Sequence, residues 1–166
     1  MNILIKKGWG ANNGAVMSSL EKIAENVSFL TIRTQEEMNS AANHKPFRNP
    51  GNLPLKSNVL YLSLELNSKQ NPLIEQSIKE LLINRKIDGK EIEKDTLVIV
   101  SSWEDHTPGL FSEDMLKDSK ANIVDFSVNN ELKYIQNEAY RAVKEVTYEL
   151  TKAKHSSRDA DSGPEL

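Results

Sequence analysis

The chain has 166 residues, a formal net charge of −3 and no cysteine. This length predicts a single domain with a core of its own, and the slightly acidic balance gives no general attraction to nucleic acid or to acidic membranes. The lack of cysteine excludes disulfides, thiolate metal sites and cysteine nucleophiles within the chain.

The apolar segments are all short. None approaches the ~20 residues that a membrane helix needs, and the chain does not open on a charged segment followed by a long apolar stretch, as a signal peptide does. We therefore expect a cytoplasmic protein with no membrane or nucleic-acid partner, and export by a route without such a signal stays open.

Strand and helix patterns alternate through the first third of the chain. A short strand, Ile3–Ile5, is followed by a glycine-rich loop, and a second strand is expected in "SFLTIRT", residues 28–34, which is rich in β-branched and aromatic residues. Between them, apolar residues recur every three or four positions, which predicts a helix. These residues are Val16, Leu20, Ile23, Ala24 and Val27.

The segment "QEEMNSAA", residues 35–42, has helical capacity, and the "NHKPFRNPGNLP" that follows it is too rich in proline and asparagine for regular structure. A third strand is expected in "NVLYLSLEL", residues 58–66. Asn71-Pro72 is typical of an N-cap with proline at the first helical position. The buried face of that helix is predicted to consist of Ile74, Ile78, Leu81 and Leu82.

Asp88-Gly89 predicts a turn in a charged stretch. The fourth strand, "TLVIVSS" at residues 96–102, is a continuous apolar run of the kind buried on both faces of a parallel sheet. A fifth strand is expected in "NIVDFSV", residues 122–128, and a last helix from about Glu131. The polar end of the chain lacks periodicity, so we predict one domain over residues 1–154 and a disordered tail over 155–166.

Five strands interleaved with helices favour an α/β fold with a parallel sheet covered on both faces. We expect a three-layer, flavodoxin-like (Rossmann-like) arrangement with five parallel strands in the order 2-1-3-4-5. Ligands of such sheets bind at the carboxyl edge of the strands.

The loop after the first strand, "KKGWGANNGA", leaves two interpretations open. Gly8, Gly10 and Gly14 do not have the standard dinucleotide-binding spacing, but glycines allow the backbone to approach an anion, and the next helix offers free N–H groups. Asn12 and Asn13 add side-chain donors. The alternative is a plain turn between a strand and a helix.

The first 27 residues resemble the opening of flavodoxin-like NADPH-dependent FMN reductases and related quinone reductases, which carry a loop of the type G-S-P-R-x-x-G-N-T. Gly8 and Gly14 match glycines of that loop. The resemblance implies that the loop, with Trp9 and Gly10 in it, holds the phosphate of FMN. The serine of the family is replaced by Trp9 and its arginine by Ala11, so backbone amides, Asn12 and Asn13 would have to hold the phosphate.

A second candidate segment, "SSWEDHTPG", follows the fourth strand directly. Ser101, Ser102 and Trp103 are expected at the ligand-binding edge, and the resemblance implies that an aromatic residue here flanks the flavin ring, as Trp103 could by stacking. His106 is either a general acid–base residue beside Glu104 or Asp105 or an ordinary solvated histidine. No metal site is predicted.

Glu65 lies at the end of the third strand, where a carboxylate is well placed to be a nucleophile, or is merely solvated. Three functions stay open. The first is an FMN-binding, NAD(P)H-dependent reductase with a small phosphate-bearing ligand; the second is a nucleoside- or nucleotide-processing enzyme that cleaves an N-glycosidic bond with Glu65. The third is an interaction module with a degenerate cofactor loop, bound to a protein partner or to a second copy as a homodimer.

Overall fold

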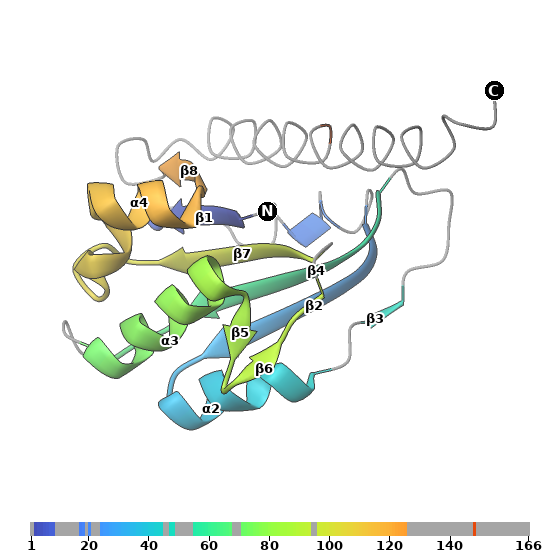
Figure 1. The fold of residues 1–166 in the computed structure, drawn as a ribbon, viewed down its shortest axis with the longest axis horizontal. Helices are drawn as coiled ribbons and strands as arrows, with labels where there is room; N and C mark the ends of the chain where they lie inside the picture. The colour runs from blue at the N-terminus through green and yellow to red at the C-terminus, as the bar shows by residue number, and fades with distance from the viewer. Residues whose placement is uncertain are drawn as a thin grey trace.

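A computed structural model describes the backbone of residues 2–8, 17–18, 20, 24–44, 47–48, 55–67, 71–93, 96–125 and 148. Its described strands form a six-stranded sheet in the order β3-β2-β4-β7-β1-β8 (Figure 1). Their bounds are β1 Asn2–Lys6, β2 Ala24–Ile32, β3 Phe47–Arg48, β4 Leu55–Leu64, β7 Leu97–Ser102 and β8 Asn122–Asp125.

Five of these strands run parallel, and only the short β3 is antiparallel, along Asn26 and Val27 of β2. The centre of the sheet consists of the most apolar strands. Every residue of β7 is buried, and four of the five residues of β1 are buried. A strand that is apolar on both faces is buried only if it has a strand on each side and packed side chains above and below the sheet. Strands of this kind therefore lie in the middle of the sheet.

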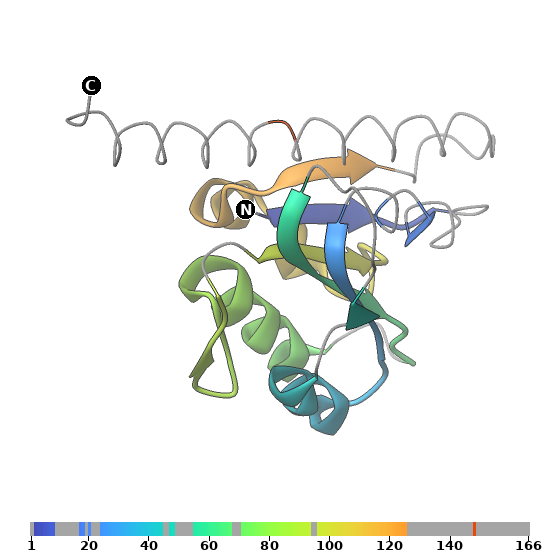
Figure 2. The same cartoon turned by 90° about the vertical axis from the view of Figure 1, so that its right-hand side faces the viewer.

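The two faces of the sheet carry separate hydrophobic clusters, because successive side chains of a strand point to opposite faces. On one face Leu4 packs with the elements α2 (Gln35–Ser40), α3 (Pro72–Asn84), η2 (Pro108–Phe111) and α4 (Glu113–Ser119). Figure 2 shows α2 and α3 together on one side of the sheet. On the other face Ile3 and Ile5 pack with the helical residues Met17 and Leu20.

The direction in which the chain crosses the sheet explains this division. From β2 through β4 and β7 to β8 the chain advances in one direction, and right-handed connections then all lie on the same face. The connection from β1 to β2 runs in the opposite direction, so it lies on the other face.

The α/β class and the parallel sheet are confirmed, but the predicted strand order 2-1-3-4-5 is wrong. β2 was expected beside β1, whereas β7 and β4 lie between them, and β1 pairs with β7 and β8. β2 is the less apolar strand and its Phe29 is 36% exposed, which suits a position near the edge. The hydrophobic pattern predicts which residues form strands, but it does not predict how many strand positions a connection crosses and hence which strands become neighbours. The three-layer, flavodoxin-like assignment stays a prediction.

Two local expectations are also corrected, and one helix was not predicted. Ala24 and Val27 belong to β2, which therefore begins earlier than predicted, and not to the preceding helix. The proline-rich connection contains the short strand β3. Helix α4 was not specified from the sequence, although Ser112 is its N-cap and accepts a hydrogen bond from the Met115 amide, followed by two acidic residues in the first turn.

Helix α3 is confirmed: it begins at Pro72, Asn71 is its N-cap residue, and its buried residues are Ile74, Ile78, Leu81 and Leu82. The turn at Asp88-Gly89 is confirmed too. It joins β5 (Lys86–Ile87) to β6 (Lys90–Glu91) with φ of 50° and 76° at its two central residues. Two positive φ values are those of a type I′ hairpin turn, which Asp-Gly favours.

The last helix predicted from about Glu131, apart from Tyr148, lies outside the described residues, as do the boundary at residue 154 and the tail over 155–166. Within the part of the chain that is described, none of the helices combines the length and apolarity needed to span a membrane.

The amino end of the sheet is held by the buried side chain of Asn2. Its Nδ2 donates to the carbonyl oxygens of Leu82, at 2.8 Å, and Ser119, at 2.9 Å, and its Oδ1 accepts from Arg85 Nη1 at 2.9 Å. Arg85 also donates to the carbonyl oxygen of Thr96. One amide therefore joins β1 to the ends of α3 and α4.

We expect Asn2→Ala to lower the free energy of unfolding by about 2 kcal/mol or more, because buried carbonyl and guanidinium groups lose their partner. Urea unfolding measures this. The matched control is Asn84→Ala, which removes an exposed amide whose one side-chain hydrogen bond to a described residue is to Glu80, and it should change the free energy by less than about 0.5 kcal/mol. Equal effects of the two substitutions would contradict the role given to Asn2.

Candidate functional site

The carboxyl ends of β1 and β7 lie side by side at a point where the chain leaves the sheet in opposite directions. Lys6 pairs with Ser102 in the register, and the Lys7 amide donates to the Ser102 carbonyl at 2.9 Å. After β1 the chain continues to Met17 and Leu20 on one face, and after β7 it continues to η2 and α4 on the other. Ligands of open α/β sheets bind in the crevice at such a point.

Lys7 ties the end of β1 to the end of β4, although β7 lies between these two strands. Its side chain is only 6% exposed, and its Nζ donates to Ser63 Oγ at 3.1 Å, the Leu64 carbonyl oxygen at 2.9 Å and Glu65 Oε1 at 2.7 Å. An ammonium group has three N–H donors, so all three have an acceptor. This satisfies the condition under which a buried cation is tolerated.

Glu65 uses its two carboxylate oxygens differently. Oε1 accepts from Lys7 Nζ and, at 3.4 Å, from Ser63 Oγ. Oε2 makes no hydrogen bond or ion pair with any described residue. The side chain is 47% exposed. Glu65 is therefore a half-exposed carboxylate whose orientation is held through one oxygen, at the carboxyl end of an inner strand.

The side chain of Lys6 lies on the opposite face of the sheet from that of Lys7. Its Nζ lies 3.2 Å from Glu104 Oε2 and 3.8 Å from Asp125 Oδ2, and it lies over the ring of Phe111 at 5.4 Å from the centroid. Both lysines at this edge are thus paired with carboxylates. A phosphate bound here would need other donors, such as backbone amides of the loop after β1.

The turn after β7 is compact and attached to α3. The Trp103 carbonyl oxygen accepts from the amides of His106, at 3.1 Å, and Thr107, at 3.2 Å. The buried hydroxyls of Ser102 and Thr107 share a hydrogen bond of 2.6 Å. These bonds close the turn upon itself.

Two side chains from the first turn of α3 reach this segment. Asn71 Nδ2 donates to the His106 carbonyl oxygen at 3.3 Å, and Glu75 Oε1 accepts from the Gly109 amide at 3.1 Å. A Cβ added at Gly109 would lie 2.8 Å from Glu75 Oε2, so the Glu75 carboxylate would have to shift to admit it. A larger residue at this position would therefore disturb the hydrogen bond between Glu75 and the backbone of residue 109.

His106 has a side chain that is 24% exposed, with Nε2 at 4.0 Å from Asp105 Oδ1. Its Nδ1 is buried and has no hydrogen-bond partner among the described residues. Of the two carboxylates predicted beside it, Glu104 turns to Lys6 instead. His106 shares no hydrogen bond or ion pair with Glu65, the other residue predicted to be catalytic.

The predicted cofactor-binding residues are placed unequally. Gly8 is buried directly after β1, Ser101 and Ser102 are fully buried, and Trp103 is partly exposed at the edge. Trp9, Gly10, Asn12, Asn13 and Gly14 lie outside the described residues. Trp103, directly after β7, is therefore accessible to a ligand, whereas the two serines at the end of β7 are not.

A buried hydroxyl network that was not predicted lies beneath this edge. The Tyr61 hydroxyl forms a hydrogen bond with the side chain of Ser101, which is paired in register with Ser63. Burial raises the pKa of Tyr61 far above its ordinary value, and the bond to Ser101 offsets a part of this rise. Sequence analysis did not predict a role for Lys7 or Tyr61. A lysine after a strand and a tyrosine within one are common, and nothing in the neighbouring sequence distinguishes these two.

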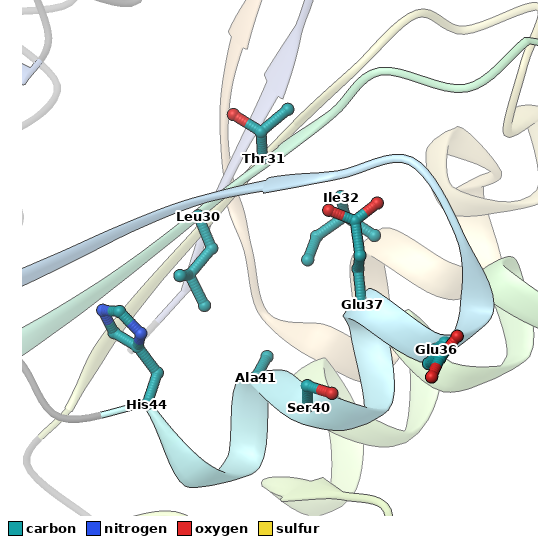
Figure 3. Close-up of a pocket in the computed structure, with 8 residues that line it drawn as sticks. All are labelled: Leu30, Thr31, Ile32, Glu36, Glu37, Ser40, Ala41 and His44. Atoms are coloured by element: carbon teal, nitrogen blue, oxygen red, sulfur yellow. The ribbon is translucent and has the colours of Figure 1, made fainter.

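A groove of about 380 Å³ lies between β2 and α2. Figure 3 shows Leu30 and Ala41 directed into it, with His44 at one end and Glu36 and Glu37 at the other. None of the residues predicted to bind or react lines this groove. Among the described residues, no three histidine, aspartate or glutamate side chains gather into a metal site.

Protein-family models, curated proteins and solved structures were all compared with the chain. No match is found. The function must therefore be inferred from the residues themselves.

The pKa of Tyr61 predicts a loss of stability in alkali. In the unfolded chain the phenol ionises near its ordinary pKa of 10.0, whereas in the folded chain it stays protonated. The raised pKa therefore gives a stabilisation that is complete below pH 10 and falls by about 1.4 kcal/mol for each pH unit above it. Tyr61→Phe should remove this contribution to the decrease of the free energy of unfolding with pH. Urea unfolding from pH 8 to pH 11 measures it.

Ser101→Ala is the control for this measurement, because it removes the same hydrogen bond and leaves the buried phenol. Both variants should lose about 1 kcal/mol at pH 8, but only Tyr61→Phe should gain on the wild type above pH 10. Parallel curves for wild type and Tyr61→Phe would show that Tyr61 ionises in the folded protein as it does in the unfolded one.

Proposed function

We propose that this protein binds a phosphate-bearing ligand with a flat ring across the carboxyl ends of β1 and β7, and that this ligand is FMN. The observation that carries the proposal is the divergence of the chain at this point. β1 and β7 are neighbours, and the segments that follow them pack on opposite faces of the sheet. Open α/β sheets bind nucleotides at such a point, between the two segments that follow the neighbouring strands.

The residues at this edge assign each end of the ligand to a segment. Because Lys6 and Lys7 are both paired with carboxylates, the phosphate would be bound by the backbone amides of the glycine-rich loop that starts at Gly8. The ring would contact the turn after β7, where the aromatic side chain of Trp103 is accessible. The resemblance of the first 27 residues to FMN reductases supports FMN among ligands of this class.

The reaction that accompanies such a site is reduction of the bound flavin by NAD(P)H. When bound, the flavin would supply the redox chemistry, and the described residues would bind and orient it. The turn at Trp103 is suited to this role, because its closure onto Ser102 and Thr107 and its attachment to α3 fix its position before the ligand arrives.

FMN added to the purified protein should lose fluorescence, and it should bind at least tenfold more tightly than riboflavin, which lacks the phosphate. Trp103→Leu should weaken FMN binding by about three- to tenfold, the free energy of one aromatic stacking contact, and Trp103→Phe should retain most of the affinity. His44→Ala, in the groove beside α2, serves as the control. Unquenched FMN, or equal affinity for FMN and riboflavin, would contradict the proposed site.

A further inference from the structure

Glu65 combines three properties that the proposed flavin site does not use. It follows β4, an inner strand of the parallel sheet, at the edge where ligands bind. Its Oε1 is held by Lys7 Nζ at 2.7 Å and by Ser63 Oγ at 3.4 Å. Its Oε2 has no polar partner among the described residues, and the side chain is 47% exposed.

This is the geometry of a carboxylate that can form a bond through one oxygen while the other stays anchored. A solvated glutamate on a surface would sample many rotamers, and both its oxygens would be equivalent. Here the ammonium that anchors it is itself fixed by the Leu64 carbonyl oxygen at 2.9 Å and by Ser63 at 3.1 Å. Reaching a reacting atom in a fixed orientation is the property that raises the rate of a nucleophile.

We propose that Glu65 is the nucleophile of a glycosyl-transfer reaction that breaks the N-glycosidic bond of a nucleotide with a pyridinium leaving group, and that Lys7 positions it. Carboxylates form covalent intermediates at anomeric carbons. Cleavage of O-glycosides in this manner normally needs a second carboxyl group to protonate the leaving oxygen. Among the described residues, the groups that contact the Glu65 carboxylate are the Lys7 ammonium and the Ser63 hydroxyl, and neither is a carboxylic acid.

Of the other described carboxylates of this edge, Glu104 and Asp125 are paired with Lys6 toward the other face, and Asp105 lies beside His106 in the turn after β7. A substrate whose leaving group departs without a carboxylic acid beside it fits these neighbours. Nicotinamide in NAD meets this condition, because the positively charged ring takes the bonding electron pair and departs as a neutral molecule.

The reaction balances with water as the only co-reactant. Glu65 Oε2 bonds to the anomeric carbon, the carbon–nitrogen bond breaks and its electron pair stays with nicotinamide. Water then attacks the same carbon, the ester bond to Oε2 breaks, and its electron pair restores the carboxylate. The proton of the water goes to solvent, so NAD and water yield ADP-ribose, nicotinamide and a proton.

Lys7 is a positioning residue in this scheme, because its three donors all bond to Ser63, Leu64 and Glu65. It holds Oε1 while Oε2 reacts. Its removal should lower kcat and leave KM nearly unchanged, since it does not face the substrate. If the role of Lys7 were purely structural, its removal would lower the unfolding midpoint but would not lower kcat selectively over KM.

The test is release of nicotinamide from NAD by the full-length protein, followed by chromatography. Glu65→Gln, which keeps the shape of the side chain, should lower the rate at least about 100-fold, and Glu65→Ala should be partly rescued by azide, which replaces the lost nucleophile. Lys7→Met should lower kcat by about 10- to 100-fold. The matched control is Glu80→Gln, an exposed glutamate of α3, with wild-type rates.

An NAD analogue with fluorine at the 2′ position slows the second step and should leave one glycosyl adduct on the peptide that contains Glu65. Equal nicotinamide release by wild type and Glu65→Gln, or an adduct on another residue, overturns the inference. Circular dichroism shows whether the Lys7 variant is folded, and the Glu65 variants decide the outcome if it is not. FMN binding is measured without NAD, so the failure of either proposal is visible by itself.

Discussion

The buried ammonium of Lys7 is the constraint on which the candidate site depends. A charge in a low-dielectric interior is costly unless it is paired and hydrogen-bonded, so the chain around Lys7 must supply three acceptors, and it does so from the end of β4. Because β7 separates β1 from β4, this requirement fixes the ends of three strands relative to one another. The orientation of Glu65 follows from it.

The topology decides where this constraint acts. After β1 the chain continues to Met17 and Leu20 on one face, and after β7 it continues to η2 and α4 on the other, with Lys7 at the end of β1 where these paths diverge. Lys6, one position earlier, points to the opposite face and is neutralised there by Glu104 and Asp125. Adjacent lysines on opposite faces are a direct result of the alternation of side chains along a strand.

Much of the fold could be predicted from hydrophobic spacing. β7 and α3 are long, regular patterns, and the residues predicted to form the buried face of α3 are the ones that are buried. The strand order could not be predicted in this way, because neighbours are chosen by the connections between strands. Phe47–Arg48 shows a second limit: a two-residue strand in a proline-rich segment forms only because β2 offers it a partner.

The candidate site was predictable only as a location. Glu65 and the segment after β7 were expected at the carboxyl edge, and they are there. The role of Lys7 depends on burial and on contacts across 56 to 58 residues of sequence, and a pattern of neighbouring residues carries no trace of such contacts. The serine hydroxyls of β7 look available in the sequence but are bonded inside the protein.

The attachment of the turn after β7 to the first turn of α3 has a consequence for how a molecule reaches this edge. Asn71 and Glu75 fasten the turn at His106 and Gly109, so swinging it outward would break two hydrogen bonds and disturb the start of a helix. The turn after β7 would therefore form a fixed wall of the proposed site, in position before any ligand binds.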